Sequence, residues 1–277
     1  MVDLSLLRHL YLWSSDQVID DIIRQYRDEK SLIVDYLYFA QAMRFRLFEG
    51  TPTAIQTAYH DALTRADFLL PDGIALQLFY RWTIWRKEKI TPTNLNGTDL
   101  CPKLLHTLVD TYGASQIHVA VFNVWDEKIG KDESYLAQIV SYIKATFMLD
   151  VDVARQCHYT ERESSDPWNI YETSLKETKK SVRILLNFIW APYQEIMTHQ
   201  KRAFVDDHHL LVLNQWWTID FRTGVETRAP RRIVRARVLE TPRRILKNPQ
   251  KNLRKFFWMF GIIRILFSIF LLKLHHR

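Results

Sequence analysis

Short apolar runs alternate with helix-like stretches along most of the chain. Runs rich in Leu, Ile, Val and Phe, each short enough for one strand, occupy residues 32–34, 68–70, 117–122, 151–153, 182–189 and 210–213. Between them, apolar residues recur three and four positions apart, which predicts helices over residues 54–66, 99–112, 135–147 and 194–204. Residues 4–26 show the same spacing and predict a first helix. Buried strands separated by helices indicate an α/β fold, with a parallel sheet covered on both faces.

Polar residues follow several of the predicted strands. Pro71-Asp72-Gly73 follows the second run, Asn123 the third, residues 190–195 the fifth and Asn214 the last. In an open parallel sheet, ligands bind at the carboxyl ends of the strands. The pattern therefore predicts one shared crevice, although ordinary loop composition explains any one of these residues alone.

Asp72 is the first candidate for chemistry. A Pro-Asp-Gly turn at a strand end can hold a carboxylate out of the sheet, where it could deprotonate a hydroxyl group as a general base. Asp beside Gly before an apolar helix is also a common helix N-cap, so the residue types leave both roles open.

The net charge of +7 is concentrated at one end of the chain. Residues 222–277 hold 15 bases against two acids, a net +13, so the preceding 221 residues carry −6. This asymmetry favours an anionic partner: a membrane, a nucleic acid or a phosphorylated substrate. A solvated basic helix without a partner is the alternative. Arg supplies every base from Arg222 to Arg244, which favours bidentate phosphate recognition.

The end of the tail combines basic and apolar residues. Residues 256–274 read FFWMFGIIRILFSIFLLKL, about the ~20 residues that a membrane span needs. Arg264 lies at the centre, where a charge costs roughly 2.5–3.5 kcal/mol. A helix lying in the membrane interface, with its flanking cations on anionic head groups, is therefore favoured over a span. A buried core helix is the third interpretation. The aliphatic runs argue against a nucleic-acid partner.

Several other classes of protein are excluded. Cys101 and Cys157 are too few and too far apart for a disulfide framework or a metal site, and they suit a reduced, cytoplasmic compartment. The first residues lack the basic region of a secretory signal. No glycine-rich dinucleotide or P-loop pattern occurs, so neither a dinucleotide enzyme nor an NTPase is expected.

An ordered set of motifs resembles the WecG/TagA/CpsF glycosyltransferase family. The segments, in chain order, are ADFLLPDGIAL, LNGTDL, WAPYQEIMTHQKR, IDFRTG and TRAPRRIVRARVLE. The similarity is in register from about residue 54 to 252 and is weak from about 122 to 180. Each motif alone is a weak signal, but the ordered set is specific.

This resemblance implies a Rossmann-like catalytic domain over residues 1–221 and an appendage over 222–277. Residues 222–246 would complete the active site and 247–277 would anchor the protein at the cytoplasmic face of the membrane. The implied reaction is an inverting, metal-independent transfer, without a cofactor, from a UDP-sugar of N-acetylmannosamine type to a polyprenyl-diphosphate-linked sugar. This is a step in cell-surface polysaccharide or glycolipid synthesis. Self-association into a homo-oligomer is also expected.

Site residues follow from the matching positions. Asp72 falls at the family's general base, and Arg228 and Arg235 fall at arginines of the closing appendage. The resemblance assigns donor binding to Gly73, Gly97, Thr98, Asp99, Gln194, Glu195, Asp220 and Tyr159. Asp220 would contact the ribose and Tyr159 would stack on uracil; an ordinary half-buried tyrosine is the alternative for Tyr159.

The sequence departs from the family pattern at several positions, one of which belongs to the sugar pocket. Relatives commonly carry Thr-x-Asn about 28 residues before the catalytic Asp, where this chain has Arg44. A membrane-bound relative that binds a nucleotide sugar or a partner protein without catalysis is therefore the second functional hypothesis.

Overall fold

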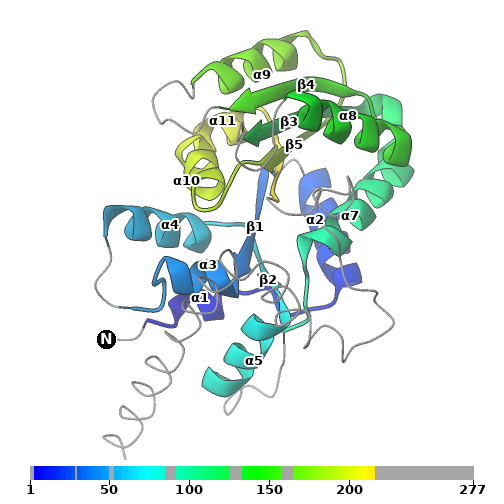
Figure 1. Cartoon of the computed structure of the whole chain (residues 1–277). Helices are drawn as coiled ribbons and strands as arrows, with labels where there is room; N and C mark the ends of the chain where they lie inside the picture. Colours follow the sequence, from blue (N-terminus) through cyan, green and yellow to red (C-terminus); the bar gives the residue numbers. More distant parts are fainter. Residues whose placement is uncertain are drawn as a thin grey trace, which may run out of the picture.

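Six parallel strands form one sheet in a computed structural model of the chain (Figure 1). The structure describes residues 3–28, 30–49, 53–84, 92–124, 133–157 and 165–215. The strands in chain order are β1 Leu32–Tyr38, β2 Phe68–Asp72, β3 Ile117–Val124, β4 Val151–Cys157, β5 Val182–Phe188 and β6 Leu211–Asn214. Their order across the sheet is β2-β1-β6-β5-β3-β4, and every pairing is parallel. The α/β prediction is confirmed, with all six strands at the predicted places.

The chain segments that follow the neighbouring central strands β3 and β5 run toward opposite edges of the sheet. The chain runs from β3 outward to β4, whereas from β5 it runs the other way to β6, although β3 and β5 are hydrogen-bonded neighbours. In sheets of this kind, ligands usually bind at the carboxyl ends of two strands whose connections diverge in this way.

Helices cover both faces of the sheet. On one face pack α2 Ser15–Arg27, α7 Gly97–Tyr112 and α8 Glu133–Phe147. The helices of the other face are α1 Ser5–Arg8, α3 Phe39–Arg44, α4 Ala54–Thr64, α5 Ile74–Thr83, α9 Ser165–Glu177, α10 Tyr193–Gln200 and α11 Arg202–Asp207. A short 3-10 turn, Ala114–Gln116, precedes β3. This layering is Rossmann-like, as the apolar pattern predicted.

The predicted helix over residues 4–26 is wrong in its middle. The chain leaves α1 at Arg8, and the Tyr11 N–H donates to the carbonyl of Leu69 in β2 at 2.8 Å. Helix α2 then begins after Ser14, whose side chain accepts from the Gln17 N–H while the Gln17 side chain accepts from the Ser14 N–H. A capping box and the free backbone edge of β2 therefore outweigh the helical spacing.

The predicted helix over residues 194–204 is also interrupted, because α10 ends at Gln200 and α11 starts at Arg202. The other predicted helices are confirmed within a few residues. Helices α3, α5 and α9 were not among the predicted ranges. None of the helices in the described ranges is long and apolar enough to cross a membrane. The predicted appendage over 222–277, with its membrane segment, lies outside the described residues.

Candidate functional site

Polar side chains gather at the carboxyl edge of the sheet, as the strand-end pattern predicted. Asp72 ends β2, Asn123 lies near the end of β3, Asn187 near the end of β5, and Asn214 ends β6. Asn123, Asn187 and Asn214 are fully buried. Because all strands are parallel, these residues share one edge.

Asp72 is the half-buried last residue of β2. The helix that follows, α5, has Gly73 as its N-cap residue and no side chain caps it, so the structure does not use Asp72 as the cap. Gly73 has φ +95°, a conformation that side-chain-bearing residues rarely adopt. Asp72 follows Leu70 by two positions and therefore faces the same side of the sheet, toward α7.

The two motifs on either side of α5 lie against each other. The Gly73 N–H donates to Asn94 Oδ1 at 2.8 Å, and the Leu95 N–H donates to the carbonyl of Pro71 at 2.9 Å. Asn96 then caps α7 by accepting from the Asp99 N–H at 3.1 Å. The first turn of a 16-residue helix, with its partial positive charge, therefore starts next to Asp72.

Three predicted donor-binding residues lie in this first turn. Gly97 and Thr98 are buried, and the Asp99 carboxylate accepts from the Asn96 side-chain amide at 3.0 Å. A cavity of about 560 Å³ extends from this turn along α7 to α8, with Asn94, Asp99, His106 and Tyr142 among its lining residues. Asp72, Gly73, Gly97, Thr98 and Asp99 are thus brought together.

Gln194 and Glu195 lie in the first turn of α10, on the other face of the same edge. Both side chains are buried, and Gln194 Nε2 donates to Glu195 Oε1 at 2.7 Å. Burial, followed by the nearby charge of Asp35, raises the pKa of the Glu195 carboxyl to about 8. At neutral pH this side chain is therefore mostly a neutral acid, able to donate as well as accept hydrogen bonds.

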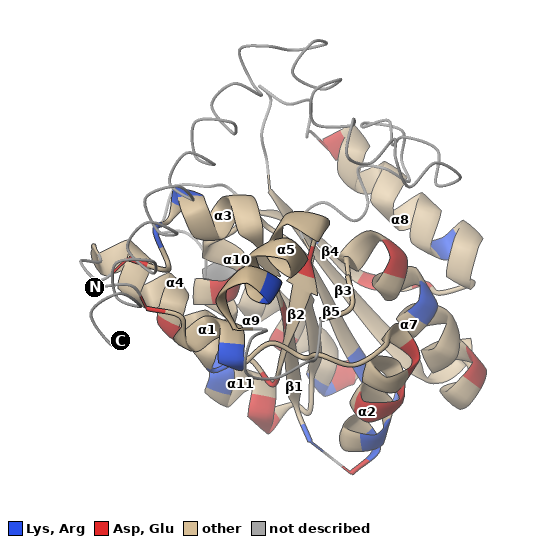
Figure 2. Ribbon diagram, turned by 90° about the horizontal axis from the view of Figure 1, so that it is seen from below, with Lys and Arg blue, Asp and Glu red and all other residues tan. Residues whose placement is uncertain are grey.

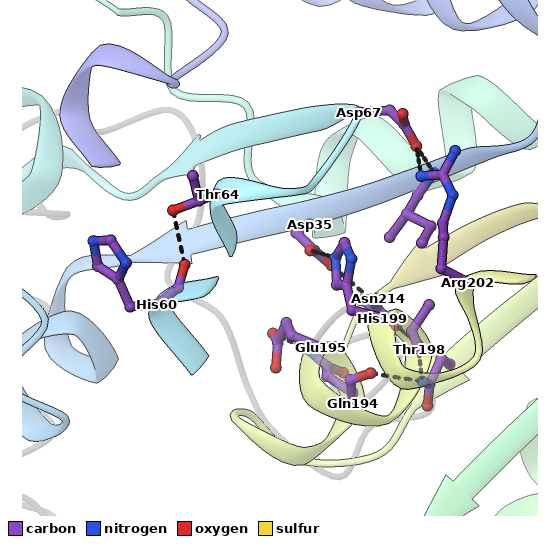
Figure 3. Close-up of polar contacts among 12 residues, drawn as sticks. Asp35, His60, Thr64, Asp67, Gln194, Glu195, Thr198, His199, Arg202 and Asn214 are labelled. Atoms are coloured by element: carbon purple, nitrogen blue, oxygen red, sulfur yellow. Dashed lines mark hydrogen bonds and ion pairs between the residues drawn. The ribbon is translucent and has the colours of Figure 1, made fainter. Parts of the chain in front are cut away.

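A buried hydrogen-bond network holds α10 in place (Figure 3). Asp35 in β1 accepts from His199 Nε2 at 2.9 Å and from Asn214 Nδ2 at 2.6 Å. Thr198 donates to Asn214 Oδ1 at 3.1 Å and accepts from Asn187 Nδ2 at 3.2 Å. The network joins the middle of β1 and the carboxyl ends of β5 and β6 to α10, and so fixes the position of the Gln194-Glu195 pair.

Asp35 was missed by the sequence analysis. It directly follows the apolar run 32–34, so the strand-end pattern that singled out Asp72 applied here too. His199 and Thr198 carry no comparable signal, because only the packing of α10 on the sheet brings them to Asp35.

The two groups of site residues face opposite sides of the sheet. Asp35 and Tyr36 are consecutive in β1 and therefore point in opposite directions. Asp35 faces α10, whereas Tyr36 OH accepts from Gln215 Nε2 at 3.0 Å on the side of α7 and Asp72. Burial, together with the nearby Cys101, Asp72 and Asp35, raises the pKa of Tyr36.

Four predicted site residues, Tyr159, Asp220, Arg228 and Arg235, lie outside the described residues. Asn123, by contrast, is described and its amide finds no hydrogen-bond partner among the described side chains and backbone. Within the same ranges, no three or more His, Cys, Asp or Glu side chains cluster closely enough to hold a metal ion.

Replacing Glu195 should change how stability depends on pH. The folded protein keeps the Glu195 proton up to about pH 8, whereas the unfolded chain loses it near about 4.3. Between these values the folded state binds more protons, so stability falls as pH rises. We expect the free energy of unfolding in urea to fall by about 3–4 kcal/mol more in the wild type than in Glu195→Gln between about pH 5 and pH 8.

The control for this measurement is Glu177→Gln, a change at an exposed glutamate at the end of α9. Its pH profile should follow that of the wild type. Parallel profiles for the wild type and Glu195→Gln would contradict a protonated Glu195.

The fold and this edge together define a Rossmann-like α/β protein with a carboxylate and two helix N-termini at the carboxyl edge of its sheet. Residues 14–277 match the sequence profile described as Glycosyl transferase WecG/TagA/CpsF family, and the chain belongs to that family. It is therefore a glycosyltransferase of cell-surface polysaccharide biosynthesis. A comparison with curated proteins found no significant match.

Proposed function

We propose that the protein transfers a sugar from a UDP-sugar to a polyprenyl-diphosphate-linked sugar, with inversion at the anomeric carbon. The observation that carries this proposal is the contact between the two motifs beside Asp72. Gly73 bonds to Asn94 and Leu95 bonds to Pro71, so a strand-end carboxylate lies next to the N-terminus of α7. A negatively charged diphosphate is favoured near a helix N-terminus, and a base is needed beside it.

The chemistry needs two groups that act at opposite ends of the reacting bond. The Asp72 carboxylate takes the proton of the acceptor hydroxyl, whose oxygen then forms the new bond to the anomeric carbon. The bond from that carbon to the UDP oxygen breaks, and UDP leaves with the electron pair. One displacement of this kind inverts the configuration. Arg228 and Arg235 would stabilise the charge that grows on the diphosphate by charge-assisted hydrogen bonds.

In this proposal no metal ion or other cofactor takes part, because the two arginines supply the positive charge. The donor surroundings would include Gly73, Gly97, Thr98, Asp99, Gln194, Glu195, Tyr159 and Asp220. Asn94, which accepts from the Gly73 N–H, also lines the cavity along α7, and the polar and aromatic lining of that cavity supports sugar binding there. Binding at the cytoplasmic face of an anionic membrane would bring the site to its lipid-linked acceptor.

The decisive experiment is a screen of radiolabelled UDP-sugars against a polyprenyl-diphosphate-linked sugar, with and without EDTA. Transfer of label into the lipid fraction from one donor, unaffected by EDTA, is the expected result. Loss of transfer in EDTA would contradict the metal-independent mechanism. UDP-sugar binding with every donor inert would instead favour the non-catalytic relative that the absence of Thr-x-Asn around Arg44 suggests.

Replacing Arg228 with lysine tests whether its guanidinium has a specific role. Lysine keeps the charge but loses the planar pair of donors that fits a phosphate. We expect Arg228→Lys to lower kcat by about tenfold or more while vesicle binding changes little. The measurement is steady-state transfer beside vesicle co-sedimentation of the same variant. Equal losses in both would show that Arg228 contributes only general basicity.

A further inference from the structure

Helix α5 exposes large apolar side chains on its outer face. Trp82 is 69% exposed and Leu78, one turn earlier, is 57% exposed. The inner face of the same helix is well packed, since Leu76, Phe79 and Tyr80 are buried. Burying these three residues suffices to dock α5, so packing within the described residues does not explain the outer pair. An exposed Leu-Trp pair on an amphipathic helix is typical of a surface that contacts a partner or a membrane.

The outer face of α5 carries a cation beside the apolar pair. Arg81, which lies between Leu78 and Trp82 in the sequence, is exposed. Phe79 packs on Phe39 with ring centroids 5.1 Å apart, which joins α5 to α3. Arg44 ends α3, and Figure 2 shows basic residues on both α3 and α5, of which Arg81 is the one on the outer face beside Leu78 and Trp82.

Arg46, two residues beyond the end of α3, is also exposed, and its Nε lies 3.8 Å from the Glu49 carboxylate. In the sequence, residues 86–89 beyond α5 carry three further bases and one acid, although they lie outside the described residues. The charge of Arg81 beside an aromatic and aliphatic pair complements an anionic lipid surface.

The location of α5 links this face to the site. The helix starts at Gly73, directly after Asp72, and lies at the end of β2 in Figure 1. If the protein lies on a membrane through the outer face of α5, the carboxyl edge of its sheet is therefore close to that membrane.

We propose that Leu78, Arg81 and Trp82 form a second membrane contact, separate from the C-terminal tail, which inserts shallowly into an anionic bilayer. Tryptophan favours the boundary between head groups and acyl chains, where its ring is buried and its N–H remains hydrated. Arginine binds lipid phosphates. With two contacts instead of one, the protein has a defined orientation, with Asp72 turned toward the lipid. The benefit of this orientation for catalysis rests on the proposed lipid-linked acceptor, but the membrane contact itself does not.

The test is co-sedimentation of the full chain with vesicles of phosphatidylcholine that contain about one third phosphatidylglycerol. We expect Leu78→Ser with Trp82→Ser to weaken binding by about tenfold or more, because two large apolar groups no longer leave water. Met148→Ser is the matched control: Met148 is 80% exposed, but it follows α8 at the opposite edge of the sheet, and its replacement should leave binding unchanged. Thermal unfolding confirms that both variants remain folded.

Two outcomes would overturn the membrane contact. The first is unchanged vesicle binding of the Leu78/Trp82 double variant. The second is an equal loss in the double variant and in Met148→Ser. If the double variant instead loses self-association in light scattering while it keeps vesicle binding, the face is an interface between two copies of the chain.

Failure of this proposal is distinguishable from failure of the proposed function. Transfer to a short-chain, water-soluble acceptor needs no membrane and should be equal in the wild type and the double variant. If the wild type transfers no sugar to any acceptor, the proposed function fails, whatever the vesicles show.

Discussion

Asp72→Asn is expected to lower the transfer rate by roughly 10³-fold while UDP-sugar binding stays nearly unchanged. The amide has the size and shape of the carboxylate but cannot take the proton of the acceptor hydroxyl. Steady-state transfer of radiolabel gives the rate, and calorimetric titration with the UDP-sugar gives the affinity. Because Asp72 is half-buried at the end of β2, thermal unfolding should accompany both measurements.

The chain offers a matched control for this change. Asp61→Asn alters an exposed carboxylate on α4, away from the carboxyl edge, and should leave transfer at the wild-type rate. Near-normal turnover of Asp72→Asn would remove Asp72 as the general base. Loss of both turnover and donor binding would assign it to donor binding instead.

Truncation after Asn252 is expected to abolish most membrane binding. It removes residues 253–277, including the apolar segment 256–274 and its flanking cations, which together would lie in the membrane interface. Co-sedimentation with anionic vesicles measures the loss. Any binding that remains should depend on Leu78 and Trp82, if the face of α5 is the second contact.

The truncated protein keeps Arg228 and Arg235, so it should still transfer sugar to a water-soluble acceptor. This comparison separates the anchor from the part of the appendage that is proposed to complete the active site. Sedimentation of the truncated chain at the full-length level would refute the anchor.

The network around Asp35 bears on how the family's Gln-Glu motif acts. Glu195 is buried and has no described partner for its Oε2 atom, while α10 is tied to three strands by Asp35, Thr198 and Asn214. The motif therefore has a fixed position and a buried carboxyl oxygen that has no hydrogen-bond partner among the described residues.

Sequence alone determined the layers of the fold and the edge that carries the site. Apolar runs as short as residues 68–70 were sufficient to place a strand. A parallel strand is buried on both faces, so its residues form a continuous apolar run that is visible in a short stretch of sequence. The motifs around Asp72 and Asn96 were likewise visible, since strand ends and helix caps use a few residue types at fixed spacing.

Only the tertiary structure decided which side chains meet. Residues 4–26 have helical spacing, yet backbone bonding to Leu69 and the cap at Ser14 divide them. Nothing local distinguishes Trp82 and Leu78, which are exposed, from Phe79 and Tyr80, which are buried. His199 reaches Asp35 across 164 positions of sequence. Contacts of this kind depend on how helices pack on the sheet, and packing is a property of surfaces that meet only after the chain has folded.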